Sequence, residues 1–223
     1  MKRLTATLAM TGLALLLTAC GKSQADSPSP AAASPTGAAT AEVLASAEVG
    51  KAAPDFALKD LDGKVHKLSD YKGKTVVLEW YNPDCPFVVK QHQEGPLKSM
   101  AKDLAGQGIV WLAINSGAPG KQGAGIERNK ASLTEYGLAH PILLDEDGKV
   151  GKAYKARNTP HMYVIKADGT LAYMGAIDNA PMGKAPESGL VNHVADALAD
   201  LAANRPVKVP ETKAYGCSVK YAD

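Results

Sequence analysis

The stretch EWYNPDCPFVVK, residues 79–90, holds one cysteine, Cys85, where a strand-like segment gives way to a helix-like one. The segment TVVLEWY at 75–81 is apolar and rich in β-branched and aromatic residues, which predicts a buried strand. Pro86 suits the first position of a helix. A thiol at a helix start meets free backbone N–H groups and the positive end of the helix dipole, and both lower its pKa. We therefore expect a reactive thiol at Cys85, with a buried and inert cysteine as the alternative.

The other segments of the chain alternate between strand and helix patterns. Asp-Gly at 62–63 predicts a hairpin, and the helix after Cys85 should be interrupted at Gly95-Pro96. The other expected elements are strands at 108–116 and 140–145, helices at 125–137, 148–156 and 188–204, and a hairpin at 161–165 and 169–175. The last helix should turn one apolar side inward, made of Leu190, Val194, Leu198 and Leu201. This order predicts an α/β fold with a mixed central sheet flanked by helices, an N-terminal β-hairpin and an irregular C-terminal tail.

The N-terminal segment has the layout of an export signal. A basic start, MKR, precedes an apolar run that ends in Leu17-Thr18-Ala19-Cys20. These four residues resemble the lipobox of bacterial lipoproteins, which implies a signal peptide at 1–19 and a lipid on Cys20. A transmembrane anchor is the alternative. Residues 20–48 are dominated by Ala, Ser and Pro and predict a disordered tether, so we place the folded domain at 49–223.

The net charge of the mature chain and its expected export exclude some classes of function. Removal of Lys2 and Arg3 would leave 23 of the 25 basic residues against 23 acidic ones, which argues against nucleic-acid binding. Membrane contact would then come from the lipid on Cys20, in the cell envelope on the periplasmic side. Gly21 is not the Asp that favours inner-membrane retention in Gram-negative lipoproteins, which favours the outer membrane. Export also permits disulfides, and two cysteines remain in the mature chain, Cys85 and Cys217.

Thr159-Pro160, immediately before a predicted strand, is a candidate cis peptide. A cysteine at a helix start, a second strand–helix unit, Thr-Pro, a hairpin and a final helix together resemble the thioredoxin fold. The opening VGKAAPDF is similar to the redoxin branch, the alkyl hydroperoxide reductase/thiol-specific antioxidant family. The segments EWYNPDCPFV, TPHMYVI, GAIDN and YGCSVKY resemble a bacterial peroxiredoxin-like subgroup, and the resemblance covers about 49–223.

The resemblance assigns expected roles to several residues. Cys85 would attack a disulfide or a peroxide, and Thr159-Pro160 would face its sulfur and offer backbone groups to an extended chain. Glu79 matches a buried acid that assists proton transfer, and burial is expected to raise its pKa. His92, two turns along the helix, is expected to be a surface or packing residue.

The departures from the family pattern are equally informative. Val88 stands where thioredoxins carry their second cysteine, while Leu78 and Asn82 stand where peroxiredoxins carry Pro and Thr or Ser. Cys85 therefore needs a thiol from elsewhere, and three possibilities stay open for Cys217: a resolving thiol, a structural bridge, or a thiol that never meets Cys85.

The leading hypothesis is a membrane-tethered thiol oxidoreductase that uses an unidentified thiol reductant and no cofactor or metal. Val88 also removes the second cysteine that copper-binding relatives of the fold use. The alternative is a non-catalytic binding module that holds an extended partner on the Thr159-Pro160 face.

Overall fold

The computed structural model describes residues 45–223. The expected signal peptide at 1–19, the lipid anchor Cys20 and most of the expected tether lie outside the described residues. Ala47, just before the expected domain start, is buried in the core, and its N–H donates to the carbonyl of Ala153 at 2.8 Å. Among residues 45–223, no helix combines the length and the apolar character needed to cross a membrane.

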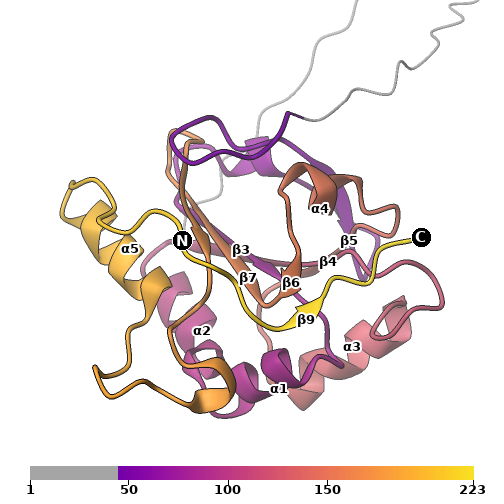
Figure 1. Ribbon diagram of the computed structural model, residues 1–223. Coiled ribbons are helices and arrows are strands. Elements are labelled where there is room, and N and C mark those ends of the chain that lie inside the picture. The colour runs from indigo at the N-terminus through magenta and orange to yellow at the C-terminus, as the bar shows by residue number, and fades with distance from the viewer. Residues whose placement is uncertain (1–44) are drawn as a thin grey trace, which may run out of the picture. The chain divides into compact units, whose positions relative to one another are not determined.

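A mixed seven-stranded sheet forms the centre of the fold, in the order β2-β1-β5-β4-β3-β7-β8 (Figure 1). Its strands are β1 (Ala57–Asp60), β2 (Val65–Lys67), β3 (Val76–Trp80), β4 (Val110–Asn115), β5 (Ile142–Leu144), β7 (His161–Ile165) and β8 (Leu171–Gly175). β3, β4 and β5 run parallel, and β7 is antiparallel to β3. The predicted α/β class, the mixed sheet and both hairpins are confirmed.

Helices cover both faces of this sheet. They are α1 (Pro86–Gln93), α2 (Met100–Ala105), α3 (Ile126–Glu135), α4 (Lys149–Ala153) and α5 (His193–Ala202), with 3₁₀ turns at Leu68–Tyr71, Pro96–Lys98 and Pro181–Gly183. β3 alternates between the two faces, as a strand does. Leu78 and Trp80 pack with Val150 of α4, whereas Val77 packs with α2 and α5 and Tyr81 with α1. Figure 1 shows α4 on one side of the sheet and α1, α2 and α3 on the other.

One helix boundary agrees with the sequence prediction, and one differs from it. The break at Gly95-Pro96 is confirmed, since α1 ends at Gln93 and α2 begins at Met100. The predicted start of the last helix at 188 is wrong, because Asn192 caps α5 by accepting a hydrogen bond from Ala195 N at 2.9 Å. Leu190 therefore lies outside the helix and is 59% exposed, not part of its apolar side.

The C-terminal tail is irregular except for one short strand. β9 (Cys217–Ser218) pairs antiparallel with β6 (Asn158–Thr159) and forms a separate two-stranded sheet. Figure 1 shows the tail running past β6 toward the side of α4 and β5. The tail thus returns to the segment that precedes Pro160.

Candidate active site

Cys85 occupies the position predicted for it, directly before α1, with Pro86 as the first helical residue. A turn at 82–85 leads into it. The side chain of Asn82 accepts a hydrogen bond from Asp84 N at 2.9 Å, and the Asn82 carbonyl accepts one from Cys85 N at 3.1 Å. Cys85 is fully buried, at 0% exposure. Its predicted position at the helix start is therefore confirmed. Its burial is a feature that the alternative of a buried and inert cysteine also predicted.

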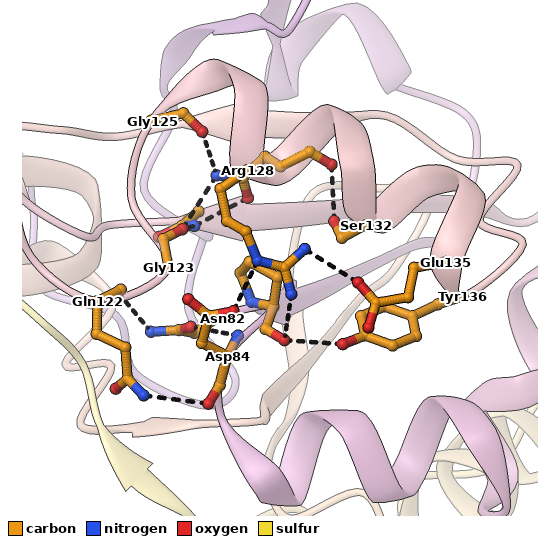
Figure 2. A network of polar contacts seen from close by, with 12 residues as sticks. Asn82, Asp84, Gln122, Gly123, Gly125, Arg128, Ser132, Glu135 and Tyr136 are labelled. Atoms are coloured by element: carbon orange, nitrogen blue, oxygen red, sulfur yellow. Dashed lines mark hydrogen bonds and ion pairs between the residues drawn. The ribbon is translucent and has the colours of Figure 1, made fainter.

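Side chains from α3 hold the turn before Cys85, as Figure 2 shows. Arg128 donates from Nε to Asp84 Oδ1 at 2.7 Å and from a terminal nitrogen to the Pro83 carbonyl at 3.2 Å. The Tyr136 hydroxyl donates to the same carbonyl at 2.9 Å. Because a planar guanidinium reaches two acceptors at once, it fixes the turn rigidly. Sequence reasoning missed Arg128, since no local pattern links it to Asp84.

Thr159 lies against the sulfur of Cys85. The Thr159–Pro160 peptide is cis, as expected. Cys85 Sγ donates a hydrogen bond to the Thr159 carbonyl at 3.0 Å. Thr159 is 1% exposed, and its buried hydroxyl makes no hydrogen bond. The predicted approach of the Thr159-Pro160 element to Cys85 is therefore present.

Cys217 also reaches this place. It pairs directly with Thr159 across β6 and β9, and it packs against the apolar cluster that contains Cys85, Tyr81 and Val88. Both cysteines are free thiols, Cys85 buried and Cys217 partly exposed. The sequence left three possibilities for Cys217. This packing disfavours the possibility that its thiol never meets Cys85.

The two thiols differ in acidity. Burial raises the pKa of Cys85, but hydrogen bonding by Cys217 and by the N–H of Val88 outweighs it and lowers the pKa below its usual value. Burial, and then the neighbouring Cys85, raise the pKa of Cys217 to about 11. Cys85 is thus the stronger candidate nucleophile, and Cys217 is the protonated thiol that stabilises it.

Glu79, on β3, is fully buried, but its pKa does not follow the expectation. Its Oε1 lies 2.8 Å from His92 Nε2, and its Oε2 accepts from Trp111 Nε1 at 3.1 Å. Burial opposes ionisation, yet His92 and Trp111 outweigh burial and lower the pKa of Glu79 below 4.5. The expected raised pKa is therefore wrong. His92 is a packing residue and not a surface one, at 2% exposure.

A second cluster of hydrogen-bonded side chains holds the C-terminal tail beside α1. The Tyr215 hydroxyl donates to Asp178 Oδ1 at 2.5 Å. Gln91 donates from Nε2 to Asp178 Oδ2 at 2.9 Å and to the Tyr215 hydroxyl at 2.8 Å. The segments GAIDN and YGCSVKY, which attracted attention only through the family resemblance, supply Asp178 and Tyr215.

These contacts define the chemistry of the site. Within residues 45–223, no three His, Cys, Asp or Glu side chains gather closely enough to hold a metal ion. The groups around Cys85 are a second thiol, a carbonyl and backbone N–H groups. Such a set is suited to thiol–disulfide exchange.

The fold and the paired thiols together place the chain among the thioredoxin-like proteins. A hypothetical protein from Sinorhizobium meliloti superimposes with a TM-score of 0.68 at 28% identity, covering 80% of this chain and 97% of that one. An uncharacterized conserved protein from Geobacillus kaustophilus also gives 0.68, at 32% identity, with 78% and 93% covered.

The chain belongs to the AhpC/TSA family, whose model matches residues 49–174. Among curated proteins, it is 33% identical over 122 residues to the thiol-disulfide oxidoreductase ResA of Geobacillus thermodenitrificans, covering 54% of this chain and 65% of that protein. It is 29% identical over 135 residues to the thiol:disulfide interchange protein DsbE of Vibrio cholerae, covering 58% and 66%. The chain thus spans just under two thirds of these relatives.

Proposed function

We propose that this protein is a membrane-tethered thiol–disulfide oxidoreductase in which Cys85 attacks the substrate and Cys217 resolves the product. The observation that carries the proposal is the position of Thr159. Its carbonyl accepts a hydrogen bond from Cys85 Sγ, and its backbone pairs with Cys217. The matching relatives named as thiol-disulfide oxidoreductases support the same chemistry.

The reaction proceeds in two exchanges. The Cys85 thiolate attacks one sulfur of a substrate disulfide, forms a mixed disulfide and releases the other sulfur as a thiolate. The Cys217 thiolate then attacks Cys85 Sγ, forms the Cys85–Cys217 disulfide and releases the second substrate thiolate. Two protein thiols are oxidised and one substrate disulfide is reduced. An external thiol reductant returns the protein to its dithiol state.

The acidity of the two thiols supports this order. The lowered pKa of Cys85 gives it the larger thiolate fraction at the start. The neighbouring Cys85 is one of the groups that raise the pKa of Cys217. Once Cys85 is in a mixed disulfide it carries no charge, so this contribution disappears and Cys217 ionises more readily. Cys217 is also the more exposed of the two, so the reductant meets it first.

A disulfide substrate is favoured over a peroxide. Leu78 and Asn82 replace the Pro and Thr or Ser with which peroxiredoxins polarise a peroxide, and the neighbours of Cys85 include the apolar Tyr81 and Val88. The alternative of a non-catalytic binding module requires a free Thr159-Pro160 face. The pairing of Thr159 with Cys217 occupies that face and speaks against it.

We assign proton handling to Glu79 acting through His92. The imidazole stands on α1, the helix that begins next to Cys85, and it bonds to the buried carboxylate. In this assignment the relay depends on the pair and not on a protonated Glu79. The readout is the rate of the second exchange relative to the first, which should fall in His92→Gln and in Glu79→Gln.

We also propose the export signal at 1–19, the lipid on Cys20 and the tether at 21–48, with the folded part facing the periplasm, at the outer membrane. The layout of the N-terminal sequence supports this. Mass spectrometry of the mature protein should find a lipidated Cys20 at its N-terminus. The variant Cys20→Ser should move the protein out of the membrane fraction, and a wild-type protein that starts at Met1 would contradict the proposal.

Thiol mapping tests the chemistry. The reduced protein is treated with stoichiometric glutathione disulfide and, separately, with hydrogen peroxide, and its cysteines are mapped by mass spectrometry. We expect glutathione disulfide to yield a Cys85–Cys217 disulfide in the wild type and a stable glutathione adduct on Cys85 in Cys217→Ser. Cys85→Ser should form neither. A Cys85 that stays reduced with both oxidants removes the catalytic proposal, and a much faster reaction with peroxide reassigns the substrate.

A further inference from the structure

We propose that the C-terminal segment 212–221 is a specificity element that restricts Cys85 to low-molecular-weight disulfides. It does so by occupying, with its own backbone, the strand edge where a polypeptide substrate would bind. This inference rests on the proposed function and names the substrate class of the same site.

The edge in question is β6. An extended polypeptide binds an exposed strand edge by donating and accepting backbone hydrogen bonds along it. Here the partner is already present, because Asn158 pairs with Ser218 and Thr159 pairs with Cys217. Cys217 stands opposite Thr159, whose carbonyl meets Cys85 Sγ. The chain's own cysteine therefore takes the place that the cysteine of a bound polypeptide would need.

The segment is fastened upstream of Cys217. Tyr215 bonds to the buried carboxylate of Asp178 and to Gln91, and its ring lies 5.9 Å from that of Phe87. Thr212 adds a further contact, since its hydroxyl accepts from Ala176 N at 2.9 Å. Asp178 is 2% exposed, so its bond to Tyr215 is shielded from water.

Gly216 lets the segment approach closely. Its φ is +112°, and a Cβ at this position would lie 2.1 Å from the Thr159 carbonyl oxygen. Only glycine fits such a position without displacement of the strand. The neighbouring Asn158 side chain donates to the Gly216 carbonyl at 2.9 Å and so reinforces this approach.

The segment is fastened again downstream. Val219 N donates to the Arg157 carbonyl at 3.0 Å, and Ala118 N donates to the Lys220 carbonyl at 2.8 Å. The Tyr221 hydroxyl donates to the Ala156 carbonyl at 2.8 Å. Release of β9 would break contacts on both sides of Cys217, and each buried group left without a partner is costly.

These contacts separate two classes of disulfide. A polypeptide disulfide needs the backbone edge of β6, and so needs β9 to leave. A small disulfide needs no backbone pairing, and local movement of the partly exposed Cys217 is enough to admit it to the buried Cys85. The segment therefore selects small disulfides over disulfides whose binding requires backbone pairing with β6.

The test compares two oxidants on the reduced full chain. One is glutathione disulfide, and the other is an unstructured peptide with a single internal disulfide. The rate of Cys85 loss is measured by quenching with an alkylating agent and by mass spectrometry, and each rate is divided by the rate of the same disulfide with free glutathione. The variants are Tyr215→Phe, which removes the hydroxyl bonded to Asp178, and Gly216→Ala, which cannot pack against Thr159. Tyr71→Phe is the control, because it makes the same change in a hydroxyl bonded to His66.

We expect the wild type to react faster with glutathione disulfide than with the peptide. The ratio of peptide rate to glutathione disulfide rate should rise about tenfold in Tyr215→Phe, which corresponds to one lost hydrogen bond to a charged group. It should rise further in Gly216→Ala and stay unchanged in Tyr71→Phe. Equal normalised rates in the wild type, or an unchanged ratio in both tail variants, overturn the inference while leaving the proposed function intact. A Cys85 that reacts with neither oxidant overturns both.

Discussion

Thr159 and Cys217 lie directly opposite each other in the pairing of β6 with β9, and the Thr159 carbonyl also accepts a hydrogen bond from Cys85 Sγ at 3.0 Å. One residue thus contacts the Cys85 thiol and pairs with the backbone of Cys217. In a Cys-x-x-Cys motif the second thiol is fixed by the helix that carries the first. Here Val88 fills that place, and a tertiary contact with the tail supplies the thiol instead. The position of the Cys217 thiol therefore depends on the pairing of β9 with β6.

The first prediction concerns the acidity of Cys85. Hydrogen bonding by Cys217 is one of the interactions that lower the Cys85 pKa. We expect Cys217→Ala to raise this pKa and Cys217→Ser to raise it less, because the serine hydroxyl still donates a hydrogen bond. The measurement is the rate of iodoacetamide alkylation of Cys85 as a function of pH. Identical profiles in Cys217→Ala and the wild type would show that Cys217 does not contact the thiolate.

The second prediction concerns the buried pair of Glu79 and His92. The variant Glu79→Gln leaves His92 and Trp111 without their ionised acceptor, and breaking a buried pair costs about 3–5 kcal/mol of unfolding free energy. Urea unfolding at neutral pH measures it. The control is Glu94→Gln, which makes the same change in a surface pair with Lys90 and should cost at most about 0.5 kcal/mol.

The pH dependence of this pair follows from the sign of the Glu79 shift. Its pKa is lowered below 4.5 in the folded protein, so ionised Glu79 stabilises the fold above that pH. The contribution is lost as the pH falls through the lowered pKa. We expect Glu79→Gln to lose stability less steeply than the wild type on acidification below 4.5. An equal slope in the two proteins would show that folding does not lower the pKa of Glu79.

Local sequence patterns predicted the parts of the fold that local rules govern. The strand–cysteine–proline order around Cys85 and the break at Gly95-Pro96 follow from backbone preferences that a few neighbouring residues set. The prediction that Leu190 belongs to the last helix was wrong. Its apolar side chain fits the helical period, but Asn192, two residues later, caps the helix and so sets where it begins.

The tertiary parts of the site were not predictable in the same way. Burial of Glu79 was anticipated, but the direction of its pKa depends on His92 and Trp111, which reach it from α1 and β4. The pairing of Cys217 with Thr159 depends on the path of a tail with almost no regular structure of its own. A two-residue strand carries no periodicity from which a pairing could be read.

The third prediction concerns Arg128, which holds the turn before Cys85. The variant Arg128→Lys keeps the positive charge but cannot reach Asp84 and the Pro83 carbonyl together. We expect a loss of about 1 kcal/mol in unfolding free energy, the usual value of one such hydrogen bond. Urea unfolding measures it, and Lys130→Arg on the same helix serves as the control with no expected loss. A stability equal to that of the wild type would mean that the bond from Arg128 to the Pro83 carbonyl adds nothing to the stability of the turn.

The last prediction concerns acid stability and His161. Burial, and then Arg157, lower the pKa of His161 to about 4 from 6.5. Between these values the unfolded chain binds a proton that the folded protein does not, so unfolding becomes easier as the pH falls. A shift of this size corresponds to about 3 kcal/mol. His140, whose pKa burial also lowers to about 4, adds to the effect.

We therefore expect wild-type stability to fall between pH 6.5 and 4, and to level off below that range as far as these two imidazoles are concerned. His161→Asn keeps a polar partner for the Tyr163 hydroxyl, which lies 3.0 Å from His161 Nδ1, and should remove part of the slope. Urea unfolding across this pH range provides the measurement. His193→Asn, at the start of α5, is the control and should keep the full slope. A wild-type curve that is flat between pH 6.5 and 4 would show that the imidazoles take up protons without unfolding.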